Sequence, residues 1–122
     1  MAMRQTILLV EDNDTIRKVL EELLEMKGFE VLPASSARKA FEISRNYNRP
    51  IHLLITDIVM PQTGGTELAR QLAILRPEIR VLFISGSPEE EILRYGAPPV
   101  GAAFLQKPVS IGNLLFKIRE LV

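Results

Sequence analysis

Chemically reactive side chains follow closely after four short apolar runs of this chain. They are Glu11 and Asp12 after residues 7–10, Asp57 after 53–55, Ser85 after 81–84, and Lys107 after 102–105. Three carboxylates, a hydroxyl and an ammonium group form a set that can hold a cation and a phosphoryl group. The sequence therefore indicates phosphoryl chemistry if the fold brings these five side chains together.

Three carboxylates that lie close together need positive charge beside them. At about 4 Å, each pair of like charges costs about 4 kcal/mol at an effective dielectric constant of about 20. Lys107 supplies one positive charge, and Mg²⁺ suits a site of a few carboxylates and phosphoryl oxygens. A carboxylate held in this way can act as a nucleophile toward phosphorus, and Ser85 can donate a hydrogen bond to a phosphoryl oxygen. The set therefore describes an aspartyl-phosphate site that uses Mg²⁺.

Alternating strands and helices must position these side chains. The apolar runs at 7–10, 31–32, 53–55, 81–84 and 102–105 are too short for buried helices and indicate strands. Stretches with helical period follow each run. They begin near Asn13 or Asp14, Ser36, Thr66, Ser87 and Ser110, and they end near Gly28, Tyr47, Pro77, Gly96 and Leu121.

Residues at helical spacing predict which helix faces are buried. In chain order these are Ile16, Val19, Leu20, Leu23 and Leu24; Ala37, Ala40, Phe41 and Ser44; Leu68, Leu72 and Leu75; and Leu114, Leu115, Ile118 and Leu121. Residues with this spacing share one face of a helix, so these side chains are expected to point into the core. Ser87 followed by Pro88 predicts a capped start for the fourth helix.

The order of these elements predicts an α/β fold built from five repeats of strand and helix. Strands joined by single helices run parallel, and their crossovers are right-handed. The segment 29–33 contains a glutamate and a proline, which an edge strand tolerates. Placing it at the edge gives the strand order 2-1-3-4-5, a doubly wound, flavodoxin-like, three-layer sandwich. The reactive side chains then lie at the carboxyl ends of the non-edge strands, where such sheets bind ligands.

Composition places the chain among small globular proteins. It has 122 residues, of which 47% are hydrophobic and 25% charged, and this suits a single domain with one core. Fifteen basic and fifteen acidic residues give zero formal net charge, so we expect no nucleic-acid partner. The lack of cysteine excludes thiol catalysis, and a single histidine excludes His-rich metal sites. No apolar run approaches the roughly 18 residues of a membrane span, and we expect a cytoplasmic protein.

Four stretches of the sequence carry a family resemblance. They are Leu9-Val-Glu-Asp-Asn13, Thr56-Asp-Ile-Val-Met-Pro61 with Gly65, Leu82-Phe-Ile-Ser-Gly86 and Phe104-Leu-Gln-Lys-Pro108. In this order and spacing, the chain resembles the receiver (response-regulator) domain of two-component signalling over essentially its whole length, residues 1–122. The resemblance implies a phospho-switch in a phosphorelay, without an output domain in this chain. The segments 76–77, 81–86 and 104–108 further resemble the corresponding segments of receivers attached to hybrid sensor histidine kinases.

The resemblance also implies a role for each acidic residue. Asp57 accepts the phosphoryl group from a phosphohistidine on a histidine kinase or phosphotransfer protein. Asp12 holds Mg²⁺ directly, and Glu11 holds it through a water molecule. Asp57 and the backbone carbonyl of Val59 complete the protein ligands of the ion.

Four further residues receive roles from the same resemblance. Lys107 pairs with the phosphoryl group, and the peptide bond between Lys107 and Pro108 is expected to be cis. Ser85 and Phe104 match the switch pair, in which the hydroxyl turns toward the phosphate and the ring turns inward. Serine stands here where threonine is commoner in the family.

Two departures from the family pattern predict particular behaviour. Val59 is apolar where many receivers carry a polar side chain, and Val59 and Ser87 flank the phosphate. Neither can position an attacking water well by charge, so we expect the phosphorylated form to decay slowly. The segment 96–101 cuts the fourth helix short. We therefore expect an altered output face where this helix, the last strand and the last helix meet a downstream protein or domain.

Three other functions are compatible with the same fold. A phosphohydrolase that works through a phospho-aspartate needs a second aspartate where Val59 stands. A flavin-binding protein needs a loop rich in Ser, Thr and Gly after the first strand, whereas residues 11–14 are acidic. An adaptor that works by protein contacts alone, without phosphorylation, has no need of the complete acidic set found here.

Two other features have simpler structural interpretations. His52 lies on no amphipathic helix, so we interpret it as a structural or solvated residue rather than a phosphohistidine. The glutamates Glu89–Glu91 are interpreted as the solvated first turn of the fourth helix, where negative charge is favourable.

Overall fold

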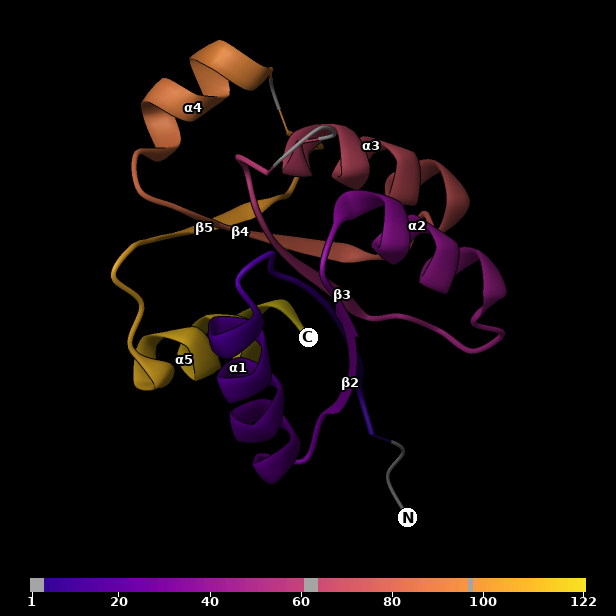
Figure 1. Ribbon diagram of the computed structural model, residues 1–122. Coiled ribbons are helices and arrows are strands. Elements are labelled where there is room, and N and C mark those ends of the chain that lie inside the picture. The colour runs from indigo at the N-terminus through magenta and orange to yellow at the C-terminus, as the bar shows by residue number, and fades with distance from the viewer. Residues whose placement is uncertain (1–3, 61–63, 97) are drawn as a thin grey trace.

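The computed structural model describes residues 4–60, 64–96 and 98–122, in which strands and helices alternate (Figure 1). The strands are β1 (Thr6–Val10), β2 (Glu30–Ala34), β3 (Leu53–Asp57), β4 (Arg80–Ser85) and β5 (Ala103–Gln106). The helices are α1 (Asp14–Met26), α2 (Ala37–Asn46), α3 (Gly65–Leu75), α4 (Pro88–Tyr95) and α5 (Ile111–Leu121). Every predicted element is present, with ends that differ from the prediction by at most two residues.

The strands form one parallel sheet in the order β2-β1-β3-β4-β5, which confirms the predicted topology. Figure 1 shows α1 and α5 together on one face of the sheet and α2, α3 and α4 on the other. Each face carries its own hydrophobic core. Leu24 and Leu114 pack into the core under α1 and α5, and Ala40 and Leu68 pack into the core under α2 and α3.

The central strands are buried on both faces, which explains their unbroken apolar sequences. Every residue of β1 and β3 is buried. Because side chains alternate along a strand, Leu8 and Val10 enter the core under α2 and α3, whereas Ile7 and Leu9 enter the other core. The ends of β1 and β3 are thereby held between two packed layers.

Polar caps and hydrogen bonds fix the ends of several elements. Asn13, rather than Asp14, caps α1, and its Oδ1 accepts the backbone N–H of Ile16 at 2.9 Å. Nδ1 of His52 accepts the backbone N–H of Thr6 at 2.9 Å, next to the start of β1. His52 is thus a structural residue, as its position in the sequence indicates.

Arg76, just beyond α3, fastens the end of α2 and the segment that follows it. Its guanidinium group donates hydrogen bonds to several oxygens of these residues. They are the hydroxyl oxygen of Ser44 and the carbonyl oxygens of Ser44, Tyr47 and Arg49. The planar guanidinium group serves these acceptors together because its donors point in several directions at once.

α4 is short and lies mostly at the surface. It ends at Gly96, whose φ of 100° belongs to the left-handed region that favours glycine, so the early end of this helix is confirmed. None of the α4 side chains that the structure describes is buried, and Ile92 packs only partly against the core. Ser87 stands at the predicted N-cap position, with Pro88 in the first turn, but it makes no side-chain capping hydrogen bond. The backbone at Ser87 (φ −145°, ψ 76°) departs from the extended conformation of the other serine caps.

The predicted inward face of α1 is wrong in its first half. Leu24 is fully buried, but Ile16 and Val19 are 48% and 49% exposed. α1 packs chiefly against the edge strand β2, so its apolar stripe is wider than the surface that the helix covers. Ile16 instead lines a groove of about 500 Å³ beside the segment that follows β5. Leu75, also predicted to point inward, is 45% exposed because it is the last residue of α3, next to a non-helical Arg76.

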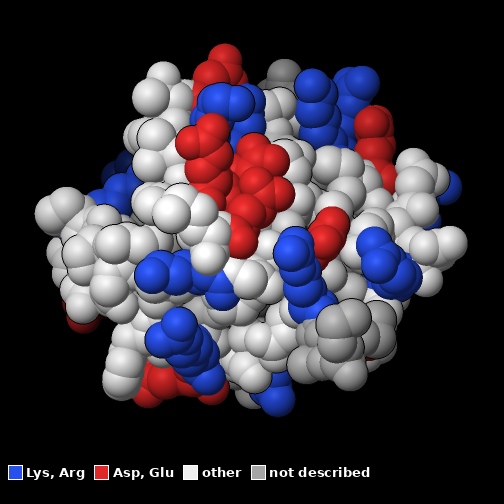
Figure 2. Space-filling model, turned by 90° about the horizontal axis from the view of Figure 1, so that it is seen from below, with Lys and Arg blue, Asp and Glu red and all other residues white. Residues whose placement is uncertain are grey.

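Charged side chains of both signs share the molecular surface. Figure 2 shows acidic side chains gathered in a block near the middle of one face, with basic side chains around that block. Within the described ranges, every helix falls short of the length and apolar character that crossing a membrane requires.

Candidate functional site

Asp57 ends β3 and is held in place by the segment that follows it. The residue is buried, with 8% of its surface exposed. The backbone N–H of Gly65 donates to the carbonyl oxygen of Ile58 at 2.8 Å and draws the start of α3 against the end of β3. A Cβ atom at position 65 would lie 1.8 Å from the carbonyl oxygen of Asp57. Only glycine therefore permits this close approach of α3 to Asp57.

Glu11 and Asp12 follow β1, the strand beside β3. The backbone N–H of Glu11 donates to the carbonyl oxygen of Ala34 in β2 at 3.1 Å, and its carboxylate accepts the N–H of Asn13 at 3.0 Å. Glu11 is therefore buried and fixed by its neighbours, whereas Asp12 is exposed to solvent.

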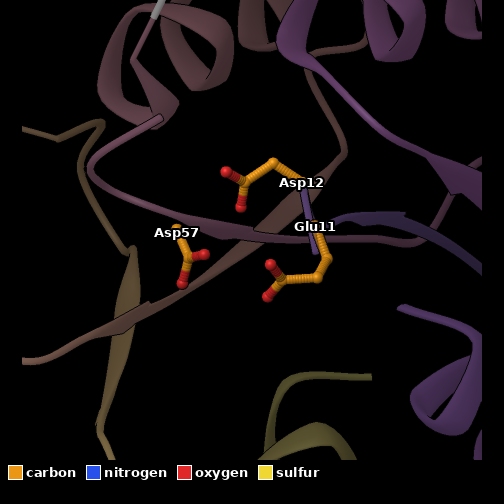
Figure 3. Close-up of side chains that lie close together, drawn as sticks. All are labelled: Glu11, Asp12 and Asp57. Atoms are coloured by element: carbon orange, nitrogen blue, oxygen red, sulfur yellow. The ribbon is translucent and has the colours of Figure 1, made fainter. Parts of the chain in front are cut away.

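The three acidic residues meet at the carboxyl edge of the sheet. Glu11, Asp12 and Asp57 each offer a carboxylate oxygen, and these oxygens all lie within 4.8 Å of one another. Figure 3 shows the three carboxylates directed toward one shared space, with Glu11 and Asp12 on one side of it and Asp57 on the other. Such a set of hard oxygen donors is what Mg²⁺ prefers in proteins.

Lys107 brings positive charge to this acidic cluster. Its Nζ lies 3.1 Å from Oδ1 of Asp57, and its backbone N–H donates to the carbonyl oxygen of Ser85 at 2.8 Å. The peptide bond between Lys107 and Pro108 is cis. Partial burial lowers the pKa of Lys107, but the hydrogen bond and charge of Asp57, with the charges of Glu11 and Glu91, outweigh it and leave that pKa raised. The side chain therefore remains a cation beside Asp57.

Burial of the carboxylates works against their negative charge. It raises the pKa of Asp57, against the hydrogen bond and charge of Lys107, which lower it. Burial likewise raises the pKa of Glu11 from 4.5 to about 6, against the hydrogen bond from Asn13 and with a further contribution from the charge of Asp57. A cation bound among these oxygens would favour their charged forms and offset the cost of burial.

The hydroxyl of Ser85 is directed away from Asp57 and toward α4. Ser85 is buried at the end of β4, and its hydroxyl donates to Oε1 of Glu91. Its oxygen accepts the backbone N–H of Ser87 at 3.1 Å. The interpretation of the glutamates as a solvated turn holds for Glu89 and Glu90, which are exposed, but is wrong for Glu91, which is partly buried.

Helical spacing could have singled out Glu91. Positions four apart share a helix face, and a helical side chain leans toward the N-terminus of its helix. Glu91 therefore lies over Ser87 and reaches back to the end of β4, whereas Glu89 and Glu90 point elsewhere. The sequence gives no comparable sign that Ser85 is the partner.

The remaining site residues lie around this edge. The ring of Phe104 in β5 is partly buried and stacks on Phe83 of β4, with 5.5 Å between ring centroids and 26° between ring planes. The side chain of Val59 is 46% exposed, and Ser87 is also exposed. The structure thus brings the acidic residues and Lys107 together, while it turns the Ser85 hydroxyl to another partner.

Comparison with known families identifies the class of this protein. The model of the response regulator receiver domain matches residues 7–119. The chain therefore belongs to the receiver-domain family of two-component signalling, and the resemblance carried by the four sequence motifs is confirmed.

Individual relatives and solved structures agree with this assignment. The chain is 34% identical over 116 residues to the response regulator receiver protein CpdR of Brucella abortus, covering 95% of each protein. It is 32% identical over 117 residues to the sensor kinase CckA of the same organism, covering 96% of this chain but only 12% of that longer protein. A receiver-domain structure from Clostridium thermocellum superimposes with a TM-score of 0.83 and 31% identity, covering 96% of this chain and 93% of that one.

Proposed function

We propose that Asp57 accepts a phosphoryl group from a phosphohistidine on a histidine kinase or phosphotransfer protein. The observation that carries this proposal is the contact between a buried carboxylate and a lysine, with Nζ of Lys107 3.1 Å from Oδ1 of Asp57, beside two further carboxylates. A receiver that served only as an adaptor would have no use for this convergence.

The donor set at the site fits Mg²⁺. Asp12 and Asp57 would hold the ion directly, together with the backbone carbonyl of Val59, and Glu11 would hold it through water. The three carboxylate oxygens within 4.8 Å of one another support this assignment, because a hard divalent cation removes their mutual repulsion. When bound, the ion neutralises charge on the phosphoryl group during its transfer.

The transfer itself needs little movement of the acceptor. An oxygen of the Asp57 carboxylate attacks the phosphorus atom and forms the new O–P bond. The N–P bond of the phosphohistidine breaks, and its electron pair stays with the imidazole nitrogen, which leaves as neutral histidine after taking up a proton. Lys107 faces the incoming charge as an ammonium group, and its charge helps to keep Asp57 ionised despite burial.

The phosphoryl group then changes the surface of the domain. In this proposal the Ser85 hydroxyl turns to a phosphoryl oxygen and Phe104 turns inward, which alters the face formed by α4, β5 and α5. That face binds the downstream protein or domain. Phosphorylation thus biases an equilibrium between two arrangements of this surface.

Intact mass after incubation with acetyl phosphate tests the acceptor. The wild type should gain the mass of one phosphoryl group when Mg²⁺ is present and not when it is chelated. Asp57→Asn should gain nothing. Asp14→Asn is the matched control, because Asp14 is 87% exposed and pairs with Arg17 rather than facing the site; it should be modified like the wild type. A wild type that stays unmodified, or an Asp57→Asn variant that is modified, would overturn the proposal.

A further inference from the structure

We propose that Glu91 accepts the hydrogen bond of the Ser85 hydroxyl in the unphosphorylated protein, and that a phosphoryl group on Asp57 must displace Glu91 as the acceptor. This inference rests on the function proposed above for Asp57. It makes Glu91 a positioning residue that acts through Ser85 and opposes the phosphorylated arrangement.

The hydroxyl of Ser85 can serve only one of the two acceptors. A serine hydroxyl has a single proton to donate, and here that proton goes to Oε1 of Glu91. Ser85 is buried, with 2% of its surface exposed, and its oxygen is further fixed by the N–H of Ser87 at 3.1 Å. A phosphoryl group presents acceptor oxygens. The phosphoryl group and Glu91 therefore compete for the same proton.

The charge of Glu91 adds to this competition. Glu91 lies close enough to Lys107 for its charge to raise the pKa of that lysine, together with the nearer Asp57. The site offers two groups to a phosphoryl group, the hydroxyl of Ser85 and the ammonium of Lys107. Glu91 thus interacts with both of them. A phosphoryl group on Asp57 carries about −1.5 to −2 charges and is repelled by the same carboxylate.

α4 is built so that Glu91 can be released. None of its described side chains is buried, its N-cap residue Ser87 makes no side-chain capping hydrogen bond, and it ends after eight residues at Gly96. Ile92 gives the helix a partial apolar contact with the core. Loss of the Ser85–Glu91 hydrogen bond therefore removes a main polar attachment of α4 and lets the helix move at small cost.

Binding of beryllium fluoride measures this competition at equilibrium. With Mg²⁺ present, beryllium fluoride on the Asp57 carboxylate imitates the phosphoryl group, and the backbone amide NMR signals of Ser85 and Ser87 report its binding. We expect Glu91→Ala to lower the half-saturating concentration about tenfold to a hundredfold, as for loss of a hydrogen bond to a charged acceptor. Glu91→Gln keeps an acceptor but not the charge, so we expect a smaller decrease, about twofold to threefold.

Two matched variants separate the hydrogen bond from the charge alone. Glu90→Ala removes the same charge from the same helix, but Glu90 is exposed, so its effect should stay below twofold. In the Ser85→Ala background no hydroxyl remains to be held. There, Glu91→Ala should act no more strongly than Glu90→Ala, which is the non-additivity expected for two groups in direct contact.

The outcomes distinguish this inference from the proposed function. Asp57→Asn should bind no beryllium fluoride. If the wild type also binds none, the proposed function fails. If the wild type binds but neither Glu91 variant binds more tightly than Glu90→Ala, the inference alone is overturned. An equal gain from Glu91→Ala with and without the Ser85 hydroxyl also overturns it, because charge would then explain the whole effect.

Discussion

The two sides of the site differ in how tightly the protein packs around them. All residues of β1 and β3, which lead to Glu11 and Asp57, are buried. On the other side, β5 has three partly buried residues and one exposed residue, and none of the described side chains of α4 is buried. The acidic residues thus stand on a rigid base, whereas Lys107 and Glu91 stand on elements that can shift.

In the proposed function, the tightly packed side carries the phosphoryl transfer and the loosely packed side carries the change of surface. Transfer of a phosphoryl group requires an acceptor and metal ligands in fixed positions, because small errors in position are costly. A change of surface requires an element that moves at low cost. A single site that spans both kinds of packing can therefore couple one to the other.

Among the variants that test this contrast, Gly65→Ala should have the largest effect on stability. A Cβ atom there would meet the Asp57 carbonyl oxygen at 1.8 Å, so the rigid side must distort. We expect the free energy of unfolding, measured by urea denaturation, to fall by about 4 kcal/mol or more. Gly112→Ala in α5 is the control, since nothing lies within 4 Å of its Cβ position, and it should change stability by less than about 1 kcal/mol. Similar small effects of both variants would contradict the contrast.

A pair of leucine truncations compares the two sides directly. Leu54 in β3 is 0% exposed, whereas Leu105 in β5 is only partly buried. Leu54→Ala should lower the free energy of unfolding by about 3 kcal/mol or more, because it leaves a cavity that cannot collapse. Leu105→Ala should cost about half as much, since its surroundings can relax. Equal losses in the same denaturation assay would show that β5 is packed as tightly as β3.

The pH dependence of stability tests the burial of Glu11. Because burial raises its pKa from 4.5 to about 6, the folded metal-free protein binds this proton more tightly than the unfolded chain. The stabilisation is therefore present below about pH 4.5 and is lost as the pH rises through about 6, with a total of about 2 kcal/mol. The raised pKa of Asp57 acts in the same direction.

Comparison of the wild type with Glu11→Gln isolates this effect. The wild type should lose about 1.5 kcal/mol relative to the variant between roughly pH 4.5 and 6.5, measured by urea denaturation with a metal chelator. Added Mg²⁺ should restore stability to the wild type at the higher pH, because the ion binds the charged carboxylates of the folded state. A stability difference that does not change with pH would show that Glu11 is solvated.

The smallest expected effect concerns the lifetime of the phosphorylated form. Val59 is 46% exposed but apolar, so it cannot orient an attacking water molecule. Val59→Asn should speed the loss of the phosphoryl group several-fold, measured by intact mass after removal of acetyl phosphate. Val59→Ala is the control, because it leaves the position apolar and should keep the decay rate of the wild type. An unchanged rate in Val59→Asn would refute the role given to this position.

Much of the fold and site follows from local patterns in the sequence. The strand order could be predicted because single helices force parallel strands and because Pro33 marks an edge strand. The meeting of Glu11, Asp12 and Asp57 could be predicted because parallel strands place their carboxyl ends at one edge.

What could not be predicted depends on contacts between elements. The stripe that contains Ile16 and Val19 has helical spacing, but the spacing does not say how much of it a neighbouring element covers. The hydrogen bonds of Arg76 join the end of α3 to the end of α2 and the loop after it, some thirty residues earlier, and no local pattern marks them. The bond between Ser85 and Glu91 likewise depends on the angle at which α4 leaves the sheet.

The proline of β2 has a consequence for the behaviour of this protein at high concentration. Glu30 directs its N–H to the carbonyl oxygen of Gln5, beside β1, so the alternation of the strand turns the backbone nitrogen of Pro33 to the outer edge. Proline has no N–H to offer there, and another chain cannot add a regular strand along β2. This edge of the sheet is therefore protected against strand-by-strand aggregation.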